Sequence, residues 1–485
     1  MSRTKKLFVF LCVVCVSIVN LFAQETPPAP SAPKSATVPA VKEKKLPNGL
    51  TVAVVERKSV PLVTIQLLIK SGASAESSDK AGLADMTASL LTKGTKTKTA
   101  TQIAEEVEFL GGSIDTGAGW NSSFISLTVT SDKVEQAMAI LADVVVNPEF
   151  DERELDLLKS QTLDGLTYNL KQPSFLASYV ASKYSFGEHP AGGTPTSIKS
   201  IQVEDVKTFY NENYRSNMSV LIFTGDINLD PASKLAAMYL ADMAKSEKAP
   251  APDLLRLSTR RPDFSKLANR LLVVDLKKSG QASVGYFKRT AKDGRKSKVY
   301  SPASVLNSVL GGGYSSRLNM EIRIKRGLSY GAGSSFSWRS NSLNFSTRAQ
   351  TKNESAAEVG DLVLVELNKL MDETVSNEEL IPRKSVLTGN FGRNLETTVG
   401  LAASIAEYYA FGIPTTEISS YVSDVNGVSG EQVKLFAIQH LSAGDIIIVG
   451  DYSIFKDDLA KRFPGMKVDV IKADELDLSK DNLRR

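Results

Sequence analysis

Hydrophobic and polar positions alternate along this chain in two ways that recur over most of its length. Short apolar or alternating runs, typical of β-strands, occur at residues 50–55, 62–70, 122–130, 270–275, 282–287 and 343–350. Segments with apolar residues three and four positions apart, typical of amphipathic helices, occur at residues 82–91, 100–110, 133–146, 152–166, 302–310 and 356–371. The pattern predicts an α+β fold in which each domain is a mixed sheet with helices packed on one face.

The two halves of the chain resemble each other at a nearly constant offset. Tyr184-Ser-Phe-Gly187 recurs as Tyr409-Ala-Phe-Gly412, and Gly225-Asp226 recurs as Gly450-Asp451, both at an offset of 225 residues. Further matches follow in the same order at offsets of 225 and 227 residues. An ordered series of this kind predicts two homologous domains of about 200 residues. We place them at residues 43–245 and 267–480, joined by a linker at residues 246–266, which carries a Pro-rich and then a basic stretch.

The first 42 residues have a different composition from the rest of the chain. A basic start with Arg3, Lys5 and Lys6 precedes an apolar run at residues 7–19, and cleavage after Ala23 would complete a secretory signal peptide. Residues 24–42 are rich in Pro and Ala and predict a flexible tether. We therefore expect an exported, periplasmic protein without an integral membrane span after cleavage. An uncleaved N-terminus that anchors the chain in the membrane is the alternative.

Charge and cysteine content exclude several classes of function. The net charge is +4, and removal of residues 1–23 lowers it to about +1, which gives no electrostatic argument for binding nucleic acid. Both cysteines, Cys12 and Cys15, lie in the predicted signal peptide, so the remaining chain has no disulfides and no thiolate nucleophile. The two histidines, His189 and His440, are 251 positions apart and do not frame a hydrolytic triad. We expect His189 to be structural, and His440, near the last strand, has no partner in the sequence.

A set of short motifs in both halves resembles the pitrilysin/insulinase family of inverted-zincin metallopeptidases, which includes processing peptidases. The resemblance covers residues 42–475, and its strength lies in the order and spacing of motifs that are weak one by one. They are Leu46-Pro-Asn-Gly-Leu50, Ser71-Gly-Ala73, Gly82-Leu-Ala84, Leu91-Thr-Lys-Gly-Thr95, Phe186-Gly-Glu-His-Pro190, Asn213-Tyr-Arg215, Gly311-Gly-Gly313, Ser316-Arg-Leu318 and Arg326-Gly-Leu-Ser-Tyr330.

The chain departs from this family at the zinc motif. Active members carry His-x-x-Glu-His on the helix after Gly-Leu-Ala, where two histidines bind zinc and the glutamate is the general base. The matching positions here are Asp85, Ala88 and Ser89, and the expected third ligand falls near Asp164. One carboxylate does not make a zinc site, and Ala88 cannot accept a proton. We predict no metal and no cofactor on this chain.

The resemblance also implies a substrate-binding pair in the second half. In the family, an arginine and a tyrosine seven positions later contact the substrate backbone and the developing oxyanion, and Arg323 and Tyr330 have that spacing. Arginine offers a charged fork of donors, and a tyrosine hydroxyl can donate to an oxyanion. We expect Gly327 to end a helix, so that Tyr330 begins the next strand.

Together these observations predict a non-catalytic, substrate-binding subunit of an exported heterodimeric zinc metallopeptidase. Its partner would be a homologous catalytic chain that carries His-x-x-Glu-His and holds the zinc ion, and its substrates would be unfolded peptides. The alternative is an inactive homologue that acts as a scaffold or a peptide-binding protein. Two further expectations concern local structure: Gly311–Gly313 forms a flexible turn, and Asp115, Gly117 and Gly119 make the family's peptide-binding edge at residues 113–130 irregular.

Overall fold

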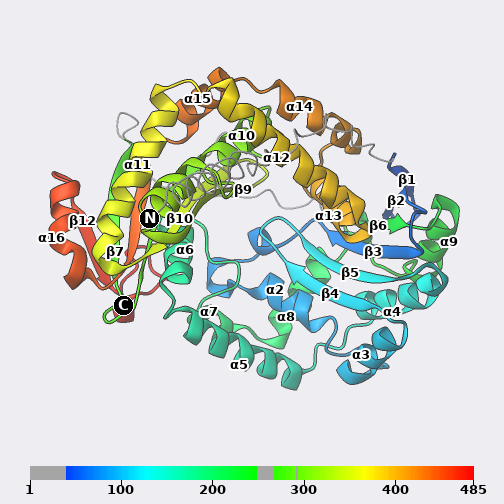
Figure 1. Cartoon of the computed structure of the whole chain (residues 1–485). Helices are drawn as coiled ribbons and strands as arrows, with labels where there is room; N and C mark the ends of the chain where they lie inside the picture. Colours follow the sequence, from blue (N-terminus) through cyan, green and yellow to red (C-terminus); the bar gives the residue numbers. More distant parts are fainter. Residues whose placement is uncertain (1–39, 248–266, 291–292) are drawn as a thin grey trace, which may run out of the picture. The chain divides into compact units, whose positions relative to one another are not determined.

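The computed structural model describes residues 40–247, 267–290 and 293–485 (Figure 1). The predicted signal peptide at residues 1–23 and the predicted linker at residues 246–266 fall wholly or mostly outside these residues, as does most of the predicted tether. Among the described residues, no helix has both the length and the apolar composition needed to cross a membrane.

The described part of the first half forms one mixed sheet and a series of helices. Its strands are β1 (Lys42–Lys45), β2 (Thr51–Glu56), β3 (Leu62–Ile69), β4 (Ser113–Ala118), β5 (Ser123–Thr130) and β6 (Ser219–Gly225). Its α-helices are α2 (Leu83–Leu90), α3 (Ala100–Phe109), α4 (Val134–Val146), α5 (Glu152–Asn169), α6 (Pro173–Tyr184), α7 (Pro195–Ser200), α8 (Val203–Asn213) and α9 (Leu229–Tyr239).

The described part of the second half repeats this scheme. Its strands are β7 (Ala268–Asp275), β8 (Ala282–Thr290), β9 (Ser329–Trp338), β10 (Leu343–Thr351), β11 (Gly444–Gly450) and β12 (Val468–Lys472). Its helices are α10 (Tyr300–Leu310), the π-helix η5 (Asn319–Lys325), α11 (Ala356–Asp372), α12 (Asn377–Glu396), α13 (Thr398–Phe411), α14 (Tyr421–Gly427), α15 (Gly430–His440) and α16 (Tyr452–Arg462).

The strand order confirms the duplication and the α+β class. The first sheet has the order β1-β2-β6-β3-β5-β4 and the second has β12-β7-β11-β8-β10-β9, so five strands correspond one to one. In each sheet the second and third strands of this order are parallel, while the three strands that follow pair antiparallel. The sheets differ at one outer strand, because β1 runs antiparallel to β2 whereas β12 runs parallel to β7.

Each sheet is buried on both faces, and the second face is covered by a helix from the other half of the chain. On the first sheet, Ala53 and Ile222 pack with Leu401 and Ile405 of α13. On the second sheet, the corresponding helix α6 contributes residues such as Val180 to a cluster with β7, β8 and β11 (Figure 1). The two halves therefore exchange equivalent helices, and each sheet carries its own domain's helices on the opposite face.

Local sequence signals explain several element boundaries. Asn48 and Gly49 form a turn, in which Gly49 has a φ of +91° and donates its N–H to Leu46 O at 2.9 Å. The expectation of an irregular edge at β4 is wrong, because all six residues pair with β5 without a shift in register. Gly119 lies beyond the strand, where its N–H bonds Ser122 O in the turn to β5, at 2.8 Å.

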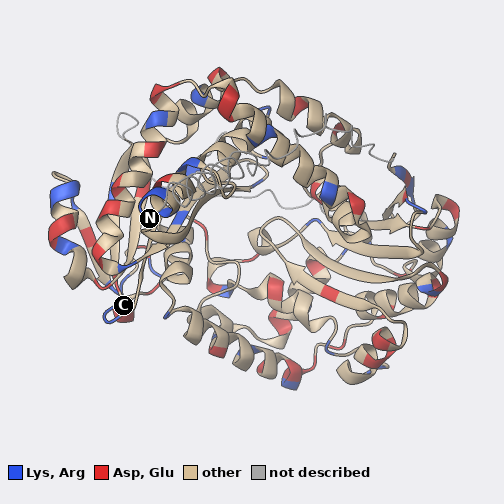
Figure 2. Cartoon of the chain, in the orientation of Figure 1, with Lys and Arg blue, Asp and Glu red and all other residues tan. Residues whose placement is uncertain are grey.

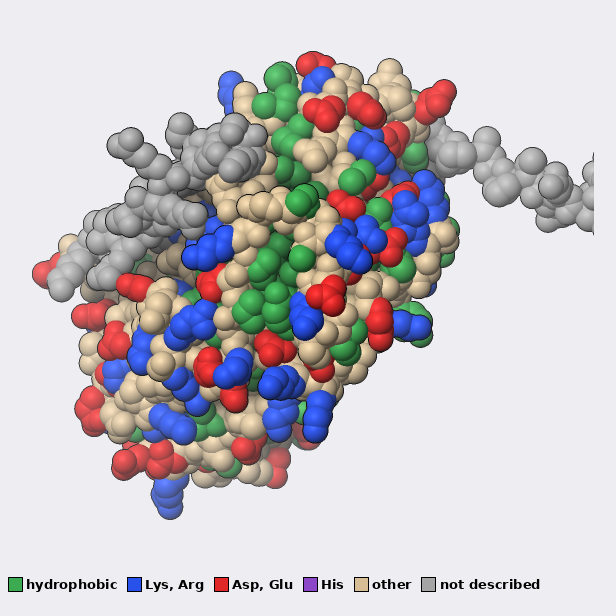
Figure 3. Space-filling model, turned by 90° about the vertical axis from the view of Figure 1, so that its left-hand side faces the viewer, with side chains coloured by type: hydrophobic (Ala, Val, Ile, Leu, Met, Phe, Trp, Pro, Cys, Tyr) green, Lys and Arg blue, Asp and Glu red, His purple; other side chains and the backbone are tan. Residues whose placement is uncertain are grey.

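Charged residues of both signs are mixed along the described elements (Figure 2). The face over α11 and α16 shows the same mixture, with hydrophobic side chains between the charges (Figure 3). Arg462 on α16, for example, pairs with Asp458 at 2.9 Å and with Asp361 of α11 at 3.4 Å. This face has no field of a single sign, in keeping with the near-neutral composition.

Candidate functional site

The segment that carries Arg323 is a π-helix, which is a less common form than the helix expected from the sequence. It ends where predicted, because Gly327 has a φ of +63° and its N–H bonds Arg323 O at 3.0 Å. β9 then begins at Ser329, so Tyr330 is the second residue of that strand. Short π-helical segments occur often at functional sites.

Carboxylates neutralise the other basic residues of this segment. Arg317 forms a two-pronged pair with Glu379, at 2.9 and 2.7 Å. Glu321 accepts from Lys325 at 2.9 Å and from Arg326 at 2.7 Å. These contacts position the π-helix and leave Arg323 as the basic side chain of the segment that has no carboxylate partner among the described residues.

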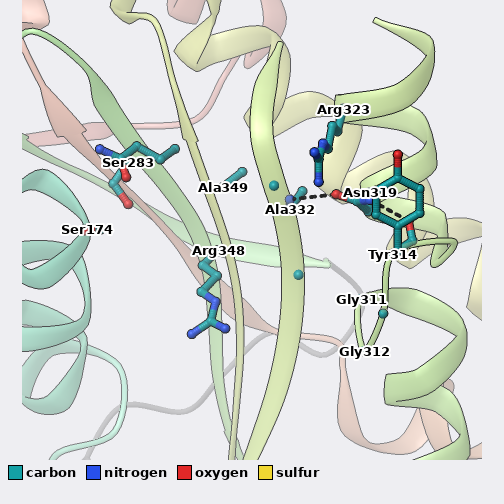
Figure 4. Close-up of a pocket in the computed structure, with 14 residues that line it drawn as sticks. Ser174, Ser283, Gly311, Gly312, Tyr314, Asn319, Arg323, Ala332, Arg348 and Ala349 are labelled. Carbon is teal, nitrogen blue, oxygen red and sulfur yellow. Dashed lines mark hydrogen bonds between the residues drawn. The ribbon is translucent and has the colours of Figure 1, made fainter. Parts of the chain in front are cut away.

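Arg323 lines a hollow of about 560 Å³ beside the edge strand β9 (Figure 4). The Arg323 side chain is half-buried, and its guanidinium lies 5.1 Å from the centre of the Tyr314 ring. The complete lining is Ser174, Ser283, Gly311, Gly312, Gly313, Tyr314, Asn319, Arg323, Gly331, Ala332, Gly333, Arg348, Ala349 and Gln350. In the part of the chain that the structure describes, this lining has two arginines and no acidic residue, so the hollow is suited to groups that accept hydrogen bonds or carry negative charge.

Tyr330 is placed differently from its predicted partner. Its side chain is 89% exposed, and its hydroxyl has no hydrogen-bond partner in the described part of the chain. It does not line the hollow, although the next residue, Gly331, does. The structure thus places Arg323 in a recess and Tyr330 at the surface close by in sequence, and their joint action on a substrate stays a prediction.

The glycines at residues 311–313 have different surroundings. A Cβ on Gly311 would lie 2.2 Å from Ser334 N of β9, and a Cβ on Gly312 would lie 2.9 Å from Asn307 O. Gly313 has open space around it. Close packing against neighbouring backbone therefore requires glycine at the first two positions. The prediction of a flexible turn did not include this constraint.

The three positions of the zinc motif lie on α2. Asp85 is half-buried and accepts a hydrogen bond from Ala118 N of β4 at 3.4 Å, Ala88 is fully buried, and Ser89 is half-buried. Burial raises the pKa of the Asp85 carboxyl, and the bond from Ala118 opposes this in part. Asp164 is exposed on α5, and no group of three potential ligands occurs among the residues described. These side chains do not fit a zinc ion, and Asp85 helps to fix β4 instead.

A buried carboxylate that the sequence did not reveal holds the start of α2. Glu76 accepts hydrogen bonds from Gly82 N at 2.7 Å and Ala84 N at 2.6 Å, where the helix presents unpaired N–H groups. His189 Nε2 lies 3.0 Å from the same carboxylate and its ring is 5.0 Å from that of Trp120. Burial raises the pKa of Glu76, while the hydrogen bonds from His189 and the two amides oppose the rise. These contacts give His189 a structural role.

His440 is also a packing residue. Its ring stacks on Phe436 with 4.5 Å between centroids, and its Nε2 lies 3.8 Å from Asp293. Burial lowers the pKa of His440, so the neutral imidazole is favoured at this position.

Next to His189, Glu188 links the two halves of the chain. Its carboxylate accepts two hydrogen bonds from Arg339, at 3.1 and 2.8 Å, and one from Asn344 Nδ2 at 3.0 Å. The Arg339 guanidinium also lies 5.0 Å from the Trp120 ring centre. The Phe186-to-Pro190 motif thus contributes Glu188 to a buried junction between the two halves.

Two family models match the chain. "Insulinase (Peptidase family M16)" matches residues 51–180, and "Peptidase M16 inactive domain" matches residues 200–385. The chain belongs to the M16 peptidase family. An "Uncharacterized zinc protease" of Rickettsia felis is 28% identical over 79% of this M16 chain and 91% of the relative. A "Non-peptidase homolog YmxG" of Helicobacter pylori is 24% identical over 81% of this chain and 89% of the relative.

Solved M16 structures agree with the fold described above. A peptidase M16 inactive domain from Pseudomonas fluorescens superposes with a TM-score of 0.76 at 25% identity, covering 85% of this chain and 98% of that one. A protease from Helicobacter pylori superposes with a TM-score of 0.77 at 20% identity, covering 85% and 99% of the two chains. The second likeness concerns the fold alone.

Proposed function

We propose that this M16 chain is the non-catalytic, substrate-binding subunit of an exported, periplasmic heterodimeric zinc metallopeptidase. The partner would be a homologous chain that carries His-x-x-Glu-His and supplies the zinc ion, the attacking water and the base. This chain would donate Arg323 and Tyr330 to the partner's zinc site. Its substrates would be unfolded peptides.

The surroundings of Arg323 and Tyr330 carry this proposal. An aromatic side chain that is 89% exposed, with a free hydroxyl among the described residues, follows a half-buried arginine by seven positions. Arginine can hold peptide carbonyl oxygens with its fork of donors, and the tyrosine hydroxyl can donate to an oxyanion. Neither group can activate water, so the pair needs chemistry from another source.

The residues of α2 support the division of labour between two chains. Ala88 stands where the general base would be and has no group that can accept a proton. Asp85 and Ser89 stand where two histidines would bind zinc, and the Asp85 carboxylate already accepts a bond from β4. The name "Non-peptidase homolog" of the Helicobacter pylori relative fits a chain of this kind.

Mixing experiments test the proposal. The purified chain should cleave no peptide alone, and activity should appear when it is mixed with a homologue from the same genome that carries His-x-x-Glu-His. Arg323→Ala and Tyr330→Phe should each lower the turnover of the mixture by a factor of roughly ten or more, as loss of a transition-state donor does.

Two substitutions serve as matched controls. Arg153→Gln removes an exposed guanidinium on α5, and Tyr168→Phe removes an exposed hydroxyl on the same helix; both should leave turnover unchanged. If the Arg323 and Tyr330 variants behave like these controls, the pair is not part of the catalytic site. Peptide binding without activity in any mixture would instead favour a scaffold or peptide-binding protein.

A further inference from the structure

Arg348 is a second basic side chain of the hollow, and neither the family resemblance nor the proposed catalytic pair gives it a role. It lies on β10, directly opposite Gly333 of β9. Its neighbours Thr347 and Ala349 are buried, while Arg348 is exposed on the other face of the strand. In the described part of the chain it makes no hydrogen bond, ion pair or ring contact.

The arrangement of the hollow separates the two guanidinium groups. Figure 4 shows Arg323 and Arg348 on either side of β9, with Ala332 between them. Among the described residues no acidic side chain lines the hollow, whereas nearby Arg317 is held by a carboxylate. Two positive charges in one recess without a counter-charge repel each other weakly and attract an anion.

The edge of β9 is not free to add a peptide strand at the hollow. Ala332 N donates to Asn319 Oδ1 at 3.4 Å, and Ser334 N donates to Gly311 O at 3.2 Å. These contacts occupy the main-chain donors that an added strand would need. Selective binding in the hollow must therefore depend on side chains, and the charged ones are the two arginines.

Gly331 of β9 leaves room for a ligand to reach both arginines. A Cβ on Gly331 would meet nothing within 4 Å, and the same holds for Gly313, which also lines the hollow, whereas a Cβ on Gly333 would lie 3.0 Å from Gly311 O. The volume of about 560 Å³ is within the range of sites that bind small ligands or a few residues of a peptide. A chain that crosses β9 here can pass from Arg323 to Arg348 without meeting a side chain at Gly331.

We propose that Arg348 forms a carboxylate subsite, so that the peptides taken by this chain carry a negative charge a few residues away from the group held by Arg323. This inference rests on the proposed function, because it takes the ligand to be a peptide. The carboxylate comes from an acidic side chain or from the peptide's C-terminus. Arginine suits this task because its planar fork matches both carboxylate oxygens.

Fluorescence anisotropy with the full chain and matched, unfolded peptides tests the subsite. One peptide carries a single Glu, its twin carries Gln at that position, and both have an amidated C-terminus. A third peptide carries Gln and a free C-terminal carboxylate. Moving the Glu along the peptide shows which position binds most tightly. The ratio of the affinities of the Glu and Gln peptides measures the effect of an acidic side chain. The ratio for the free-acid and amidated peptides measures the effect of the C-terminus.

The expected result is about tenfold tighter binding of one carboxylate-bearing peptide than of its neutral twin, with the advantage reduced by salt. Arg348→Gln should abolish the advantage, Arg348→Lys should keep part of it, and Arg153→Gln, an exposed control on α5, should leave it intact. Thermal unfolding of the variants checks that they fold, which we expect because Arg348 makes no hydrogen bond, ion pair or ring contact with the described residues.

Equal affinities for acidic and neutral peptides in the unmodified chain would overturn the subsite, as would an advantage that survives Arg348→Gln. An absence of binding for all peptides would also overturn it. The fate of the proposed function is decided separately, by whether the mixture with the partner cleaves peptides and needs Arg323.

Discussion

The buried junction around Glu188 makes a quantitative prediction about stability. Its side chain is 3% exposed and that of Arg339 is 12% exposed, so Arg339→Ala would leave a buried carboxylate without its charged partner. Removing one member of a buried pair costs about 3–5 kcal/mol in the free energy of unfolding. We expect about 3 kcal/mol, the low end, because Asn344 still donates to the Glu188 carboxylate.

Tryptophan fluorescence during urea unfolding is a suitable assay for this junction. The chain has two tryptophans, and both lie there: Trp120 packs under Arg339, and Trp338 precedes Arg339 and accepts a bond from Asn121 at 3.2 Å. Circular dichroism recorded in parallel shows whether the junction and the remaining structure unfold together, which the free-energy comparison requires.

Two further variants test whether the loss of stability in Arg339→Ala comes from the unpaired Glu188 carboxylate. Adding Glu188→Gln to Arg339→Ala should recover about 1–2 kcal/mol of unfolding free energy, because burying a neutral amide without a charged partner costs less than burying a carboxylate without one. Arg484→Ala is the matched control, since Arg484 pairs with Asp469 at the surface, where such pairs contribute about 0–1 kcal/mol. If Arg339→Ala costs no more than Arg484→Ala, the junction does not contribute to stability as argued.

The remaining predictions concern α2, the glycine turn and the exchanged helix. Burial raises the pKa of Asp85 in the folded chain above the unfolded value of about 3.9. The contribution of Asp85 to stability is therefore more favourable below the unfolded pKa than at neutral pH. Asp85→Asn should therefore stabilise the chain at pH 7 and have little effect at pH 3 in urea titrations; no difference between the two pH values would refute this. Gly311→Ala should destabilise by about 1–3 kcal/mol because its Cβ meets β9, whereas Gly313→Ala, with open space, should not; equal unfolding midpoints would contradict the close packing. Ile405→Ala on α13 should cost about 2–5 kcal/mol in urea unfolding, since this fully buried side chain of the second half packs on the first sheet, and a loss below 1 kcal/mol would argue against the exchange.

The sequence was sufficient for the α+β class, the duplication and many of the strands and helices, because these depend on local periodicity and on repeated landmarks. The buried runs at β3 and β8 and the glycine that ends η5 belong to this group. The exchange of α6 and α13 was missed, since an amphipathic pattern shows that a face is buried but not which sheet covers it.

The site was predictable only in part, for a similar reason. The spacing of Arg323 and Tyr330 was visible in the sequence, and the structure places Arg323 in a hollow. Arg348 has no motif around it, and it joins the hollow only because β10 pairs with β9. Glu76 and Glu188 are likewise brought to their partners by contacts between distant segments.

In the proposed heterodimer, this chain holds the substrate while the partner chain hydrolyses it. The most direct measurement is the peptide turnover of the chain mixed with its His-x-x-Glu-His homologue, compared with each protein alone and with the Arg323→Ala mixture. We expect activity that needs both chains and falls by roughly tenfold or more without Arg323. Zinc-dependent hydrolysis by this chain alone, or full activity of the Arg323→Ala mixture, would contradict it.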